Sequence, residues 1–242
     1  LTIEEATDPI RWDGDFKAAD VSTAAESAGF VLSMLIPLLI AVWSASAAMQ
    51  PSIDLTAGER ERGTMESLLC TAATRKELLF GKWLAVATIG TGAVLLQITI
   101  FLAAFSFLLP AGFFGIPELG AVSILSLVLS VILFATSVVA IELALAVRAR
   151  SVKEAGTTLA PLLMAFIAPA LFAQFVNLEG IELWWFAAPV FNVCLAMREA
   201  LLGINDPVHI AIWASTSVMY AVLAVSWASK QFNREDLVES IN

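Results

Sequence analysis

The chain has 242 residues, of which 59% are hydrophobic and only 14% are charged, and its formal net charge is −9. A soluble domain usually has about 25% charged residues, so this composition excludes an ordinary soluble fold. The acidic balance also argues against nucleic-acid binding, which requires basic patches. Apolar runs of roughly 20 residues recur, and each is long enough to cross a hydrocarbon core of about 30 Å. We therefore predict an all-α, polytopic helical membrane bundle.

The first segment, residues 1–28, is polar and acidic, with seven acidic residues in the first 26 positions. It starts with Leu1 and shows no signal-peptide pattern. We interpret this segment as the end of an external domain. We expect the full protein to have a further N-terminal part before it.

Five membrane spans are predicted after this segment, at about 29–49, 83–109, 119–147, 155–176 and 208–229. Lys and Arg in the short connections set the orientation of such spans. They gather in 54–82, in 148–154 and in the tail after residue 229, whereas 110–118 has none and 177–207 has only Arg198. One orientation satisfies all five connections: the three basic segments are cytoplasmic, and the other two loops are external.

The segment 183–203 is apolar enough to be a sixth span. A sixth span would place the basic tail outside, however, and would leave Arg198 and Glu199 at a costly depth unless they are paired. Trp184 and Trp185 suit the membrane interface. We interpret the segment as an external re-entrant helix, or a pair of short helices, and keep a full span as the alternative.

Residues 54–83 form a charged island between two apolar runs, with five basic and five acidic residues. Leucines stand among these charges at helical spacing, and Gly63 and Gly81 are expected to interrupt the helices. One interpretation is a solvated helix with local ion pairs, each worth a few tenths of a kcal/mol. The other is a helix, starting near Glu59, whose apolar side chains pack on the bundle or on a partner. Those side chains are Met65, Leu68 and Leu69.

The sequence has no pattern typical of catalysis or metal binding. The Gly81-Lys82 pair lacks the rest of a P-loop, so ATP-driven work requires another subunit. The one histidine, His209, fits a capping or interfacial role. Cys70 and Cys194 are predicted on opposite faces and lack metal-ligand spacing. We expect no catalytic residue, metal site or cofactor in this chain.

Glu142 is the ionisable residue that lies well inside a predicted span, which makes it a candidate for a transport path. The alternative is a structural carboxylate near the cytoplasmic interface, about six residues from Arg148, paired with a basic residue or a neighbouring helix. Gln97 and Gln174, also within predicted spans, are weaker candidates for the path. Hydrogen bonding between helices is the usual role of such amides.

The island contains E-R-E-R-G-T-M-E-S-L-L at 59–69, a turn at 70–74, and R-K-E-L-L-F-G-K at 75–82. This pattern resembles the cytoplasmic signature of permease subunits of type 2 ABC exporters, although the turn lacks the usual proline. S-V-K-E-A at 151–155 is a second match. The tail F-N-R-E-D-L at 232–237 is similar to the sodium-extruding branch of that family.

The resemblance implies six spans in the full chain, with residues 29–242 forming spans two to six of the transmembrane domain. It also implies a homodimer or heterodimer of permeases, each bound to a separate ABC ATPase that holds ATP and Mg. Residues 54–82 become a cytoplasmic coupling region. The coupling residues implied are Glu59, Arg60, Glu61, Arg62, Gly63, Thr64, Glu66, Leu68 and Leu69.

The function expected from the resemblance is a permease subunit of an ATP-driven exporter in a prokaryotic plasma membrane, with Na⁺ as the suggested substrate. The alternative is a membrane sensor or scaffold that recruits a soluble partner through 54–82 without transport. An intramembrane hydrolase is disfavoured, because the sequence shows no convergent set of His, Asp and Ser.

Overall fold

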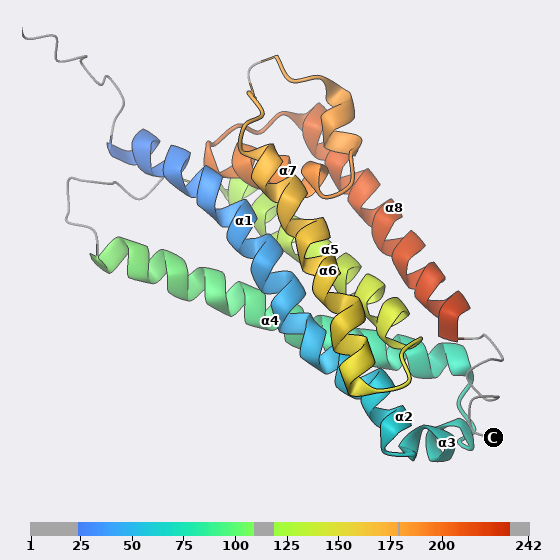
Figure 1. Cartoon of the computed structure of the whole chain (residues 1–242). Helices are drawn as coiled ribbons and strands as arrows, with labels where there is room; N and C mark the ends of the chain where they lie inside the picture. Colours follow the sequence, from blue (N-terminus) through green and yellow to red (C-terminus); the bar gives the residue numbers. More distant parts are fainter. Residues whose placement is uncertain (1–23, 109–118, 179, 233–242) are drawn as a thin grey trace, which may run out of the picture.

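The computed structural model describes residues 24–108, 119–178 and 180–232, and all regular structure in these ranges is helical (Figure 1). A π-helical turn η2 (Asp54–Gly58) and a 3-10 turn η3 (Leu183–Ala187) accompany the α-helices. The α-helices are α1 (Ala24–Ile53), α2 (Glu59–Glu61), α3 (Thr64–Leu69), α4 (Arg75–Leu108), α5 (Ala121–Ala146), α6 (Val152–Ala173), α7 (Phe191–Leu201) and α8 (Pro207–Phe232). The expectations for residues 1–23, for the loop 110–118 and for the tail after Phe232 fall outside the described residues.

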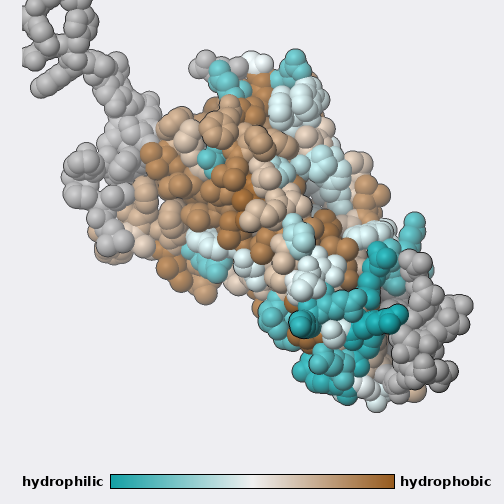
Figure 2. All heavy atoms as spheres, in the orientation of Figure 1, coloured by the Kyte–Doolittle hydropathy of each residue, from teal (hydrophilic) through white to brown (hydrophobic). Residues whose placement is uncertain are grey.

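Five helices are long and apolar enough to cross a membrane: α1, α4, α5, α6 and α8. The prediction of an all-α polytopic bundle is confirmed. Figure 2 shows a hydrophobic surface along the bundle and a hydrophilic surface at the end where α2 and α3 lie. We call this the basic end, because Arg60, Lys82, Arg148 and Lys230 belong to it, and we call the other the opposite end.

The start of α4 differs from the prediction, because the helix begins at Arg75 and not near residue 83. A capping box explains the early start. The Thr74 backbone N–H donates to Glu77 Oε2 at 2.7 Å, and the Glu77 N–H donates to Thr74 Oγ1 at 3.3 Å. Gly81 lies inside α4, so the interruption expected there is wrong. Gly63, with a φ of 69°, does separate two helices.

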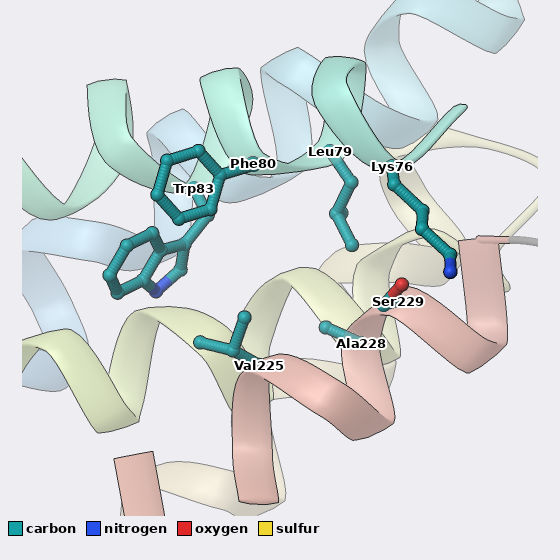
Figure 3. Close-up of a pocket in the computed structure, with 7 residues that line it drawn as sticks. All are labelled: Lys76, Leu79, Phe80, Trp83, Val225, Ala228 and Ser229. Carbon is teal, nitrogen blue, oxygen red and sulfur yellow. The ribbon is translucent and has the colours of Figure 1, made fainter. Parts of the chain in front are cut away.

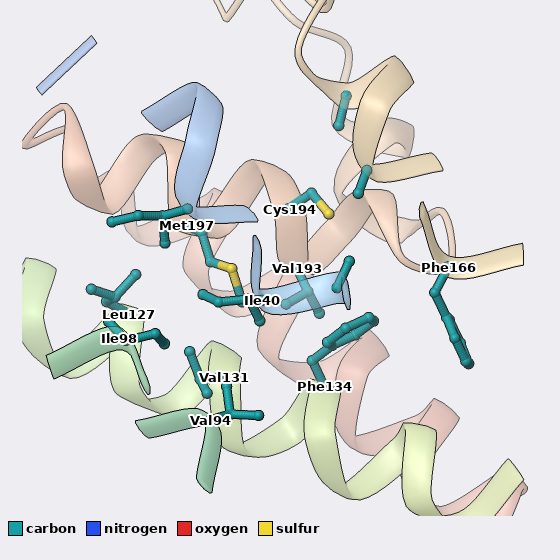
Figure 4. Packing of buried hydrophobic residues seen from close by; sticks show 14 of the residues in the cluster. Ile40, Val94, Ile98, Leu127, Val131, Phe134, Phe166, Val193, Cys194 and Met197 are labelled. Carbon is teal, nitrogen blue, oxygen red and sulfur yellow. The ribbon is translucent and has the colours of Figure 1, made fainter. Parts of the chain in front are cut away.

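Helix α5 is the centre of the bundle and contacts α1, α4, α6, α7 and α8. Its Val131 and Phe134 pack with Ile40 of α1, Val94 of α4 and Phe166 of α6 (Figure 4). Lipid tails are as apolar as these side chains, so close van der Waals packing is what favours helix association inside a membrane. The core therefore requires a tight fit.

Small residues allow α1, α4 and α5 to approach closely. Gly90 of α4 lies between the other two helices, and a Cβ placed there would be 3.5 Å from Ala48 Cβ and 3.8 Å from Val139 Cγ2. Ala41, Ala45 and Ala48 of α1 are fully buried. Such interfaces favour Gly, Ala and Ser because their backbones can come into contact.

The segment 183–203 forms η3 and α7, which together lie at the opposite end of the bundle (Figure 1). With 11 residues, α7 is too short to cross a membrane, which requires about 20. It contacts α1, α5, α6 and α8. The structure therefore has the pair of short helices that the sequence suggested.

Candidate functional site

Helix α1 continues through η2 into α2, and Arg62 caps the end of α2 with its side chain folded back onto η2. Its Nε donates to the Gly58 carbonyl at 3.1 Å, and its Nη2 donates to the Asp54 carbonyl at 3.2 Å. The Gly58 carbonyl also accepts from the Arg62 backbone N–H at 3.1 Å, so the side chain adds further bonds to those of the backbone. A Cβ on Gly58 would lie 2.8 Å from Arg62 Nη2, so glycine leaves room for the guanidinium.

Arg60 of α2 reaches across to the end of α5. Its Nη2 donates to the Val147 carbonyl at 2.9 Å, and its Nη1 donates to the Ala149 carbonyl at 3.0 Å. The C-terminal end of a helix carries a partial negative charge, so a cation there is favourable. The planar guanidinium can donate both bonds at once, which an ammonium cannot do in the same geometry.

Glu61, the next residue, binds the start of α6. Its Oε2 accepts a hydrogen bond from the Val152 backbone N–H at 2.8 Å. The N-terminal end of a helix carries a partial positive charge, so this carboxylate complements it. Arg60 and Glu61 together hold both sides of the short turn that joins α5 to α6.

Glu59 connects α2 to α4. The Lys82 ammonium forms an ion pair with Glu59 Oε2 and also donates to the Leu55 carbonyl at 2.7 Å. Lys82 lies two turns inside α4 and is 8% exposed, which is low for a lysine. Its partners stabilise the charge that burial would otherwise penalise.

We call these interactions of Glu59, Arg60 and Glu61 the α2 contacts. Their partners lie between 23 and 91 residues away in the sequence. They are therefore not the local ion pairs of a solvated helix, which was one interpretation of the island. One turn of helix is connected to α4, α5 and α6 at once, and a displacement of α2 would act on all three.

Helix α3 supplies an exposed surface beside the α2 contacts. Gly63 separates it from α2, so the single helix expected over 59–69 is two helices. Met65 is buried against Leu79, Ala144, Val147 and Ala228, which holds α3 on the bundle. Thr64 and Ser67 are exposed and Leu68 is half-buried. The side chains of Glu66 and Leu69 are outside the described part of the structure.

Glu142 lies inside the bundle, 2% exposed, between α5 and α1. The Ser52 hydroxyl donates to its Oε2 at 3.4 Å, so the partner that the structure shows is on a neighbouring helix, which is one of the alternatives left open by the sequence. Gln97 of α4 is half-buried beside Val94 and Ile98, near the middle of the core. The structure does not bring Gln97 and Glu142 together.

Arg198 ties α7 to the end of α6 at the opposite end. Its Nη1 donates to the Ala173 and Val176 carbonyls, the latter at 2.8 Å, and the residue is 5% exposed. The sequence predicted that Arg198 would need a partner. The sequence could not predict which carbonyls accept from Arg198, because every residue has a backbone carbonyl and its side chain does not show whether that carbonyl is free.

Glu199 binds the first turn of α8. Its Oε1 lies 2.7 Å from His209 Nδ1, and the His209 ring stacks on Phe186 with centroids 4.2 Å apart. Burial raises the pKa of the Glu199 carboxyl, and the hydrogen bond and charge of His209 partly offset this. His209 thus connects η3, α7 and α8.

A sequence profile of the ABC-2 family transporter proteins matches residues 4–181. The chain belongs to the ABC-2 transporter family. It is similar to the ABC transporter permease protein NatB of Bacillus subtilis (strain 168), with 31% identity over 204 residues. That alignment covers 81% of this chain and 51% of the relative, so this ABC-2 permease spans about half the length of the curated relative it matches.

Family membership and the apolar helices establish a multi-pass membrane protein that is a transmembrane permease of an ABC transporter. The sequence resemblance to type 2 ABC permeases is confirmed. Within the described residues, no group of three or more His, Cys, Asp or Glu side chains could hold a metal ion.

Proposed function

We propose that this ABC-2 permease is the membrane part of an ATP-driven exporter in a prokaryotic plasma membrane. In this proposal the basic end faces the cytoplasm, a separate ABC ATPase holds ATP and Mg, and two permeases form a homodimer or heterodimer. The α2 contacts are the observation that carries the proposal, because they join one exposed turn to three spanning helices. An ATPase bound at that turn would act on the whole bundle.

The proposed mechanism is mechanical. The ATPase binds the exposed side of α3 together with Arg62, Gly63 and Thr64. Closure of the ATPase dimer displaces α2, and Arg60 and Glu61 transmit the displacement to the α5–α6 turn. Glu59 transmits it to α4 through Lys82. Rearrangement of these helices then exposes a path toward the outside.

Na⁺ is the proposed substrate, on the strength of the resemblance to the sodium-extruding branch. Glu142 is the proposed acidic group on the path, and Gln97 is a second polar group nearer the middle of the core. Glu142 is buried between α1 and α5, so transport through it requires these helices to separate.

Docking and transmission can be tested separately in proteoliposomes that contain the permease and its ATPase. Arg62→Glu reverses a charge on the exposed docking surface, and we expect it to abolish ATPase binding while membrane insertion is unchanged. Lys230→Glu makes the same charge change at the end of α8 and should keep full binding. Full ATPase binding and export by Arg62→Glu would show that docking is elsewhere.

Transmission is tested by Arg60→Ala combined with Glu61→Ala. This variant should still bind the ATPase, because the exposed side of α3 is unchanged, but should export much less Na⁺ per ATP hydrolysed. Normal export by this variant would refute transmission through α2. If the wild-type complex binds the ATPase but exports nothing and leaves hydrolysis unchanged, the protein is a scaffold and not a transporter.

A further inference from the structure

An apolar groove of about 190 Å³ lies between the first turns of α4 and the last turns of α8 at the basic end (Figure 3). It is separate from the α2 contacts and from Glu142. Among its lining residues only Lys76 is charged. The groove is lined by Lys76, Leu79, Phe80, Trp83, Val225, Ala228 and Ser229.

Two aromatic rings of α4 form a fixed wall of this groove. Phe80 and Trp83 lie with ring centroids 5.4 Å apart and ring planes inclined by 36°. The Trp83 Nε1–H donates to the Thr136 carbonyl at 3.2 Å, which holds the indole against α5. Phe80 is 53% exposed. The wall therefore combines an indole held in place with an exposed phenyl ring, and together they form an apolar surface that an acyl chain could cover.

The mouth of the groove is polar. Lys76 extends along it toward the Ser229 hydroxyl (Figure 3). Its neighbour Glu77 is engaged by Thr74 in the capping box, so that carboxylate already has partners. Within the described part of the chain, Lys76 belongs to neither of the ion pairs, which are Lys82–Glu59 and His209–Glu199. An exposed ammonium is thus available beside a hydroxyl donor.

The groove lies at the ends of two of the helices that are long and apolar enough to cross a membrane. It lies where α4 begins at Arg75 and where α8 approaches its last residue, Phe232. Basic pockets between spanning helices at this level recognise anionic lipid headgroups. We propose that the groove binds one anionic phospholipid, with an acyl chain against Phe80 and Trp83 and the phosphate at Lys76 and Ser229. This site does not depend on the proposed transport cycle.

The charge requirement is tested by titrating the delipidated full-length protein in detergent with phosphatidylglycerol or phosphatidylcholine and counting bound lipids by native mass spectrometry. We expect a phosphatidylglycerol preference of about fivefold, the effect of roughly one lysine at a membrane surface. Lys76→Ala should remove the preference, and Lys76→Arg should keep it. Lys153→Ala, which removes an exposed lysine of α6, is the matched control and should keep it.

The groove itself is tested by Val225→Phe, which fills its wall from α8, with thermal stability measured in parallel to confirm folding. We expect one fewer bound lipid of either headgroup. An unchanged number of bound lipids, or an equal loss of preference in Lys76→Ala and Lys153→Ala, would overturn the proposal. A gain of one bound lipid after deletion of residues 233–242 would also overturn it, because the chain's own acidic tail would then be the occupant.

Discussion

At each end of the bundle an arginine side chain donates to backbone carbonyls at a helix end, but the two arginines lie in different surroundings. At the basic end Arg60 donates to carbonyls at the end of α5, and at the opposite end Arg198 donates to carbonyls at the end of α6. Arg198 belongs to α7, which is buried from Asn192 to Leu201, whereas Arg60 belongs to an extension with an exposed face. The comparison indicates that Arg198 makes its bonds inside a packed helix, whereas the bonds of Arg60 lie beside a surface that a partner could reach.

The largest expected effect is at Arg198. Arg198→Met keeps the apolar stem but leaves the Ala173 and Val176 carbonyls without their donor in a buried site. We expect thermal unfolding in detergent to show a loss of about 3 kcal/mol. Lys153→Met, which removes an exposed lysine, is the control and should change stability little. A loss below about 1 kcal/mol would mean that α7 is not fixed by this contact.

A smaller loss is expected at Arg60, whose guanidinium is half-buried. Arg60→Ala should lower the free energy of unfolding by about 1–2 kcal/mol, because two hydrogen bonds to the carbonyls of Val147 and Ala149 are lost from a half-buried side chain. Arg60→Lys should recover less than half of the loss, since an ammonium cannot make both bonds in the same plane. The same thermal assay measures both variants. Equal effects at Arg60 and Arg198 would remove the contrast between the ends.

Gly63 tests the separation of α2 from α3. Its φ of 69° is strained for any residue with a Cβ, and nothing lies within 4 Å of the Cβ position. Gly63→Ala should therefore cost about 1 kcal/mol through the backbone alone. We expect a larger effect on ATPase stimulation than on stability, because the orientation of α3 changes. Gly156→Ala, a helical position with equally open surroundings, is the control; it should leave ATPase stimulation unchanged and raise stability by about 0.5–1 kcal/mol.

Glu142→Gln should have the smallest effect on stability. The amide oxygen can still accept from the Ser52 hydroxyl, so the change should be within about 1 kcal/mol. Under the proposed path, Na⁺ efflux should nevertheless fall strongly, because the negative charge is lost. Gln97→Leu provides the comparison and should reduce efflux less. Unchanged efflux in Glu142→Gln would assign this carboxylate a structural role.

The sequence predicted the spans because long apolar runs are a strong signal. It predicted the short helices of 183–203 because Arg198 and Glu199 would be costly inside the bilayer if that segment crossed it. The early start of α4 was readable in Thr74-x-x-Glu77 but was missed in favour of Gly81. The partners of Glu59, Arg60 and Glu61 could not be predicted, because helical spacing reports only neighbours three or four residues away. For the same reason, Ser52 could not be identified as the partner of Glu142.

The central claim, that α2 and α3 move together with the start of α6, is tested directly by a distance measurement. Cys70 is exposed and Cys194 is buried, so a spin label can be attached at Cys70, with a second at Lys153→Cys. In the complex with the ATPase, ATP binding should leave the distance between labels at Cys70 and position 153 unchanged. A second protein carries Cys70→Ser, Lys153→Cys and Lys230→Cys. In that protein, ATP binding should change the distance between the labels at positions 153 and 230. A change between Cys70 and position 153, with no change between 153 and 230, would contradict the account.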